Sequence, residues 1–183
     1  MPTLPTHAVA ALGVGALFGG REVPGKVWAL GAACAMLPDL DVVAFRLGIP
    51  YGHLLGHRGL SHSLAFAAAL AAVLTALFFR RSVPGLGPWK LALFLFAATA
   101  SHGLLDAFTD GGLGVAFFAP FDNHRFFFPD RPIEVSPIGL RRFLTGRGLE
   151  VLRSELQWVW LPALLLVAGR WGLNRTAGSP SRT

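Results

Sequence analysis

Five apolar segments, separated by shorter polar connections, dominate the chain and predict helices that cross a membrane. They run from about Thr6 to Gly20, Val27 to Phe45, His62 to Phe79, Trp89 to Phe108 and Leu156 to Leu173. A spanning helix needs roughly 20 apolar residues, with about 17 as the lower limit. Three or four segments meet this length, whereas the first is short and is expected to be tilted, partial or packed inside the bundle.

The connection between the fourth and fifth segments, about residues 109–155, is long and rich in proline and phenylalanine. Its prolines forbid a continuous helix, because proline lacks an amide proton and clashes with the preceding turn. Phenylalanines crowd the stretch from Phe117 to Phe128 and make it too apolar for a free loop. We therefore expect a folded cap at the membrane interface. The fold class predicted is all-α: an integral membrane helical bundle of four to five helices with this Pro/Phe-rich interfacial cap.

The composition supports one membrane-embedded domain. Of the 183 residues, 53% are hydrophobic and 14% are charged, and the mean hydropathy is +0.54, which is too apolar for an ordinary soluble domain. We expect residues 1–174 to form this domain and residues 175–183 to form a disordered polar tail. The single cysteine, Cys34, excludes an internal disulfide framework.

The basic residues give the chain a net charge of +6 at pH 7. They are mainly arginines scattered near the ends of the apolar segments, so they fit the flanks of membrane helices better than a nucleic-acid surface. The predicted partner is therefore the lipid bilayer, and no nucleic acid is expected. Short basic connections hold Arg21 with Lys26 and Arg80 with Arg81, which predicts that they face the cytoplasm and that the opposite face lies outside it.

Most of the histidines and several aspartates fall at the ends of the apolar segments. An up-and-down path through the bundle brings these places to one membrane face, while the opposite ends carry arginine and lysine but no histidine. Ionisable groups in a membrane bundle are costly, so a functional site is the default expectation. The residues gathered at this face are His7, Asp39, Asp41, His57, His62, His102 and Asp106.

Taken singly, these residues have ordinary structural explanations. His102 and Asp106 are four residues apart, share one helix face and can stabilise each other by a hydrogen bond. Asp39 and Asp41 follow Pro38 and can mark a helix break. Side chains two residues apart in a helix point to different sides, so we expect only one of these two carboxylates to face the centre.

The stretch "HRGLSHS" at residues 57–63 also has an ordinary explanation. Ser61 can cap the third helix while His57 and Arg58 stay solvated. His53 and His124 fit ordinary surface positions.

Taken together, the seven residues favour a metal site. Imidazole and carboxylate ligands without thiolates suit a divalent metal, zinc first, with manganese or iron as alternatives. A closed structural site needs four ligands, and seven candidates are available. The excess fits two ions, or one ion whose histidine ligands are oriented by further carboxylates.

Four motifs, "PDLD", "HRGLSHS", "SHGLLDAFTDGG" and "FFFPDRPIEVSPI", resemble those of the YdjM-like family of bacterial and archaeal inner-membrane proteins. The resemblance extends from His7 to about Pro137. That family is described as predicted membrane-bound, metal-dependent hydrolases. The resemblance therefore implies a hydrolase in a prokaryotic cytoplasmic (inner) membrane. The basic connections separately predict that the face of the metal site lies on the extracytoplasmic side.

The order of the site residues also resembles a wider group, the all-α zinc-dependent phospholipases C and P1-type nucleases. Those enzymes use an early histidine, an aspartate, a histidine and an H-x-x-x-D pair on a helix. His7, Asp39 or Asp41, His62, and His102 with Asp106 follow that order. The group adds a further histidine and an H-x-x-x-E pair that complete a three-metal cluster. This chain has no such pair, so we expect one or two ions.

We interpret the chain as a membrane-bound, metal-dependent hydrolase that cleaves a phosphoester with metal-activated water, as a phosphatase or in the manner of a phospholipase C. A lipid is the expected substrate, because the site lies at interfacial depth under a phenylalanine-rich cap. Asp39 or Asp41 would orient or deprotonate the water. Arg58, Arg125 and Arg131 would bind the phosphate, since the planar fork of arginine suits its oxygens.

Three other classes stay open. A metal-stapled structural or partner-binding membrane protein would saturate the metal with protein ligands. A metal-ion transporter would need ionisable groups through the bilayer, and the third segment offers none from Leu64 to Phe79. A nuclease would need a basic groove with stacking aromatic residues, which the sequence does not show.

Overall fold

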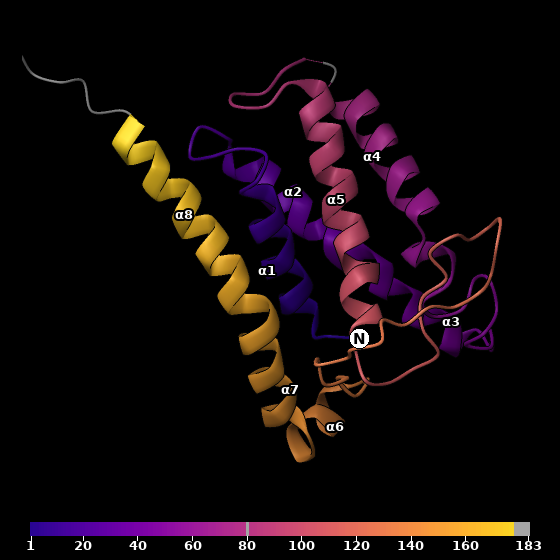
Figure 1. Ribbon diagram of the computed structural model, residues 1–183. Helices are drawn as coiled ribbons and strands as arrows, with labels where there is room; N and C mark the ends of the chain where they lie inside the picture. The colour runs from indigo at the N-terminus through magenta and orange to yellow at the C-terminus, as the bar shows by residue number, and fades with distance from the viewer. Residues whose placement is uncertain (80, 178–183) are drawn as a thin grey trace, which may run out of the picture.

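The computed structural model describes residues 1–79 and 81–177, and within these ranges the chain is helical and forms no strand (Figure 1). The all-α prediction is therefore confirmed. Two 3-10 turns, Leu37–Val42 and Leu60–His62, and one π turn, Leu156–Trp160, interrupt the helices. The α-helices are α1 (Leu4–Gly15), α2 (Gly25–Met36), α3 (Val43–Arg46), α4 (Leu64–Phe78), α5 (Pro88–Ala107), α6 (Leu140–Thr145), α7 (Gly148–Glu155) and α8 (Leu161–Ala177).

Local sequence explains where two of the long helices begin. Pro88 occupies the first turn of α5, where its missing amide proton costs nothing. Ser63 caps α4 by accepting a hydrogen bond from the amide of Phe66 at 3.0 Å. Ser61, the cap that the sequence allowed, lies instead in the 3-10 turn before α4 and is free for another role.

Small residues allow the helices to approach closely. Helix α1 packs against α2, α5 and α8, and α4 packs on the far side of α5 (Figure 1). A Cβ atom added at Gly13 would lie 2.8 Å from Ala163 Cβ, and one at Gly31 would lie 2.2 Å from the ring of Phe94. Van der Waals packing of this kind is what holds helices together in a membrane. The buried core around Phe94 includes Ala11, Val27, Leu91, Leu95 and Ala98.

Within residues 1–79 and 81–177, two stretches are long and apolar enough to cross a membrane, Gly25–Arg46 and Gly148–Gly172. Helices α1 and α4 are apolar but shorter, with 12 and 15 residues. At 1.5 Å per residue they are about 18 and 22 Å long, against roughly 30 Å for the hydrocarbon core. The prediction of three or four full-length spans is thus not confirmed. α5, with 20 residues, has the length of a span but carries Lys90, His102 and Asp106.

The segment 108–139 is irregular and lies beside the end of α5 that carries Asp106 (Figure 1). Bridges between Thr109 and Ile133 and between Val115 and Phe126 fold it onto itself. The predicted cap, about residues 109–155, is not confirmed as one unit, since residues 148–155 are the first turns of the helical stretch Gly148–Gly172. Residues 175–177, predicted as tail, belong to α8, and residues 178–183 lie outside the described residues.

Candidate metal centre

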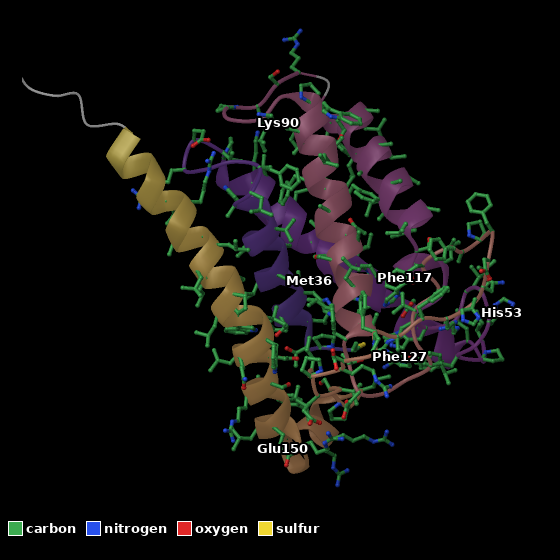
Figure 2. All side chains as sticks on the ribbon, in the orientation of Figure 1. Met36, His53, Lys90, Phe117, Phe127 and Glu150 are labelled. Atoms are coloured by element: carbon green, nitrogen blue, oxygen red, sulfur yellow. The ribbon has the colours of Figure 1, made fainter. Side chains whose placement is uncertain are left out.

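Five buried ionisable side chains meet at one end of the helices. His7 comes from α1, Asp39 from the turn after α2, His62 from the turn before α4, and His102 and Asp106 from the last turns of α5. Each is at most 4% exposed. Figure 2 shows Lys90 at the opposite end, as the up-and-down path predicted. The structure therefore brings together five of the seven predicted ligands in a single cluster.

The ligand atoms lie close enough for a single ion. His62 Nε2 lies 3.0 Å from His102 Nε2 and 3.4 Å from Asp106 Oδ2, and His102 Nε2 lies 3.4 Å from Asp39 Oδ1. Two ligands bound about 2.0–2.2 Å from one zinc ion stand at most about 4.4 Å apart. One atom from each of these four side chains lies within 4.8 Å of the others, so little contraction would gather them around one ion.

The cluster also contains polar atoms that the protein leaves without hydrogen bonds. Both carboxylate oxygens of Asp39, both of Asp106 and both ring nitrogens of His7 are buried and have no hydrogen-bond partner among the described residues. A buried carboxylate without donors costs several kcal/mol unless a cation compensates it. The donor set therefore fits a divalent metal, which would satisfy these atoms together.

Hydrogen bonds behind the cluster orient its two central histidines. His102 Nδ1 donates to the carbonyl of Ala35 at 2.6 Å, and His62 Nδ1 lies 3.1 Å from Asp41 Oδ2. Both Nε2 atoms consequently face the cluster, the arrangement found around metal-binding histidines. Burial lowers the pKa of His62, but contacts with Asp106 and Asp41 outweigh it and raise that pKa to about 9. A metal entering the site must displace this proton.

Asp41 and His57 form a second group beside the cluster. Asp41 Oδ1 lies 2.5 Å from His57 Nδ1, and Asp41 Oδ2 accepts hydrogen bonds from the hydroxyl of Ser61 at 2.6 Å and the amide of Arg58 at 3.1 Å. The expectation that one of the two aspartates faces the centre agrees with this geometry, since Asp39 does so. Asp41 contacts Nδ1 of His62 and so helps to orient its ring. Together with His57 and His62, Asp41 also offers ligand atoms for a second ion.

His7 lies against the cluster from the side of α1. Its ring stacks on that of His102 with 3.7 Å between centroids. Its Nε2 atom lies 3.8 Å from both Asp39 Oδ2 and Asp106 Oδ1. A small movement would make it a further ligand.

Arg58 is buried against the cluster, and its guanidinium contacts three neighbouring groups. Nε lies 2.8 Å from Asp106 Oδ2, in an ion pair whose N–H does not point at the carboxylate. The two terminal nitrogens donate to the carbonyl of Gly111 at 2.9 Å and the hydroxyl of Thr109 at 3.0 Å. Its backbone has φ +61, a conformation that costs a non-glycine residue about 1–3 kcal/mol. These contacts tie Arg58 to Asp106 and leave it few donors for a substrate.

Arg125 and Arg131, the other predicted phosphate ligands, lie farther out. Arg125 is half-buried and donates at 3.0 Å to the carbonyls of both His57 and Tyr51, so it joins segment 108–139 to the loop before α4. Arg131 is exposed and lies over the ring of Phe127. Phosphate binding by these arginines stays a prediction.

Two residues that the sequence analysis did not identify, Gly103 and Glu155, support the position of the cluster. A Cβ atom at Gly103 would lie 2.9 Å from the carbonyl of His62, so only glycine lets the turn approach α5. Glu155 is fully buried and accepts hydrogen bonds at 2.7 Å from the hydroxyls of Thr3 and Thr6, next to His7. The signal for Gly103 was its place inside "SHGLLD", whereas nothing local connects Glu155 with residues about 150 positions earlier.

His53 and His124 are exposed, as expected.

The fold and the site define a helical membrane protein with a buried histidine–aspartate cluster able to hold a metal. The chain belongs to the YdjM inner membrane protein family, whose match covers residues 1–176. It is 42% identical over 175 residues to Inner membrane protein YbcI of Escherichia coli (strain K12), covering 96% of this chain and 100% of that relative. The predicted inner-membrane location is thus confirmed.

No solved structure matches the chain, and the likeness to zinc-dependent phospholipases C stays a prediction.

Replacing His102 with alanine is expected to remove the metal. Losing even an outer partner of a metal ligand weakens binding about 10–100-fold, so loss of a ligand should lower zinc affinity at least as much. Metal analysis of the purified, zinc-loaded protein measures this. His124→Ala is the matched control, because His124 is exposed and should keep full occupancy. Equal zinc content in the two variants would remove His102 from the ligand set.

Replacing Arg58 with methionine is expected to destabilise the metal-free protein by about 3–5 kcal/mol, because Asp106 loses the buried cation beside it. Thermal unfolding in detergent measures the change, and zinc should restore part of the stability by supplying positive charge. The exposed Arg131→Met control should cost about 1 kcal/mol or less. Similar small effects in both variants would show that Arg58 does not stabilise the cluster.

Proposed function

We propose that this protein is a metal-dependent hydrolase of the inner membrane and that it cleaves a lipid phosphoester. The observation that carries the proposal is the set of buried Asp39 and Asp106 carboxylate oxygens that accept no hydrogen bond from the described residues, next to three histidines. A divalent metal bound there would supply Lewis-acid chemistry, making water a nucleophile near neutral pH and neutralising phosphate oxygens.

Some residues of the cluster would hold the metal ion, and others orient the residues that hold it. Asp39, His62, His102 and Asp106 would hold the ion, and His7 would join them or bind a second one. Asp41 keeps Nε2 of His62 directed at the centre and is placed to take part in proton movement through the Asp41–His57 pair.

A lipid substrate is supported by where the cluster lies. The stretch Gly25–Arg46, which is able to cross a membrane, contains Asp39 and Asp41. Exposed apolar side chains continue along α4 and α8, where Leu77 is 62% and Leu165 is 73% exposed, as expected for surfaces that face lipid. A phosphoester in the headgroup layer would therefore meet the cluster at the end of the helices.

Phosphate release from lipids tests the proposed activity. The purified zinc-loaded protein, mixed with detergent-dispersed phosphatidic acid and other lipid phosphoesters, is expected to release phosphate or a phosphorylated headgroup. Chelation and His102→Ala should lower the rate by at least about 100-fold, which corresponds to roughly 2.7 kcal/mol of transition-state stabilisation. Stoichiometric zinc without turnover on any phosphoester would instead favour a metal-stapled structural protein.

We also propose that the cluster faces away from the cytoplasm, because the basic connections lie at the opposite end of the helices. Arg21 and Lys26 flank the α1–α2 connection, and Arg81 and Lys90 flank the α4–α5 connection. Short connections rich in lysine and arginine stay cytoplasmic.

Cysteine labelling in intact cells measures this orientation. In a protein whose Cys34 is replaced by alanine, a cysteine at the exposed Ser82 should resist an impermeant maleimide, because it lies in the cytoplasmic α4–α5 connection. A cysteine at the exposed Asn123, in segment 108–139, should react readily and serves as the control. The reverse pattern would overturn the assignment.

A further inference from the structure

A cavity of about 540 Å³ adjoins the cluster on the side of Asp39. Its volume lies within the range of small-molecule sites. Its wall is formed by the first residues of the chain, by the turn after α2, by residues 136–139 of the irregular segment, and by Phe143, Leu152 and Trp160. Among the described residues, Asp39 is the one that belongs to both the cluster and the cavity wall, so the cavity adjoins the candidate metal centre.

Apart from Asp39, the wall offers almost only apolar surface. Leu4, Leu40, Ile138 and Leu152 line it and are 44%, 62%, 47% and 44% exposed. Burying such side chains against an apolar ligand is favourable, at about 25 cal/mol for each Å² of apolar surface removed from water. A sugar phosphate or nucleotide would find few hydrogen-bond partners along this wall. The cavity therefore suits a ligand with a long apolar part, and the anionic end of that ligand follows from the phosphoester proposed for the cluster beside it.

The cavity also lies between the two stretches that are able to cross the membrane. Asp39, Leu40 and Val42 belong to Gly25–Arg46, and Leu152 and Trp160 belong to Gly148–Gly172. A lipid in the bilayer could therefore reach it sideways, without leaving the membrane.

A second cavity, of about 370 Å³, provides a contrast. It lies between α1 and α8 and is lined by Leu12, Trp28 and Leu164 among others. None of the described residues in its wall is ionisable or belongs to the cluster. An apolar cavity of that kind gives no reason to bind a phosphate.

We infer that the cavity beside Asp39 binds the hydrocarbon chain of the lipid phosphoester and thereby places its phosphate at the cluster. The inference rests on the proposed function and deepens it, because it assigns the substrate to lipids that carry a long chain close to the phosphate. Selectivity for chain length would then depend on Leu40, Ile138 and Leu152, while the cluster with its metal would bind the phosphate.

Photolabelling tests this inference without requiring turnover. The probe is a hexadecyl phosphonate with a diazirine near the end of its chain, added to the zinc-loaded protein in detergent. Peptides that contain residues 136–143 and 148–155 should carry the label. Unlabelled hexadecyl phosphonate should compete, whereas hexadecanol, which lacks the anionic end, should compete at least tenfold less well.

Two variants that fill the cavity, Leu152→Trp and Ile138→Trp, should lower this labelling by tenfold or more while bound zinc stays unchanged. They should also lower the ratio of long-chain to short-chain turnover. The matched control is Leu164→Trp, in the second cavity, which should label within twofold of the unmodified protein.

Labelling that is unchanged in both variants would overturn the inference. Equal competition by hexadecanol, which indicates ordinary lipid contact, would overturn it as well. Specific labelling by a protein that hydrolyses no phosphoester would support the chain-binding cavity and reject the hydrolase, so the two failures are distinguishable.

Discussion

Two buried carboxylates, Asp39 and Asp106, are the constraint on which the rest of the site depends, because they accept no hydrogen bond in the part of the chain that the structure describes. Their burial at the end of a helical bundle is unfavourable unless positive charge lies beside them. The protein supplies one guanidinium, from Arg58, and a protonated His62, and it places two further imidazoles within 4 Å. A divalent cation would complete this charge balance, and it accounts for why so many ionisable groups lie together.

The surrounding structure serves to hold these groups in place. The carbonyl of Ala35 fixes His102, Asp41 fixes His62, and Gly103 lets the two backbones approach. Arg58 keeps a left-handed backbone conformation because its side chain is anchored at three points. Metal sites depend on such outer contacts nearly as much as on the ligands themselves.

The sequence predicted the parts of this arrangement that follow from helical geometry. His102 and Asp106 share a face because they are four residues apart, and an up-and-down path brought His7, Asp39 and His62 to the same end. Local patterns could not separate the roles of Asp39 and Asp41, because that depends on the 3-10 turn in which both lie.

Contacts between residues far apart in the sequence explain where the structure differs from the predicted cap. The predicted cap extended to residue 155, whereas in the structure α7 continues through a π turn into α8. Glu155 stabilises that continuation through hydrogen bonds to Thr3 and Thr6, contacts that no local pattern reveals. The three or four full-length spans predicted are not confirmed, since α1 and α4 have only 12 and 15 residues.

X-ray absorption spectroscopy of the purified, zinc-loaded protein tests the central claim most directly, because it reports the atoms bound to the metal. The cluster predicts a shell of nitrogen and oxygen at about 2.0–2.2 Å with the scattering pattern of imidazole, and no sulfur at about 2.3 Å. A zinc–sulfur shell, or a protein that takes up no divalent metal, would contradict it.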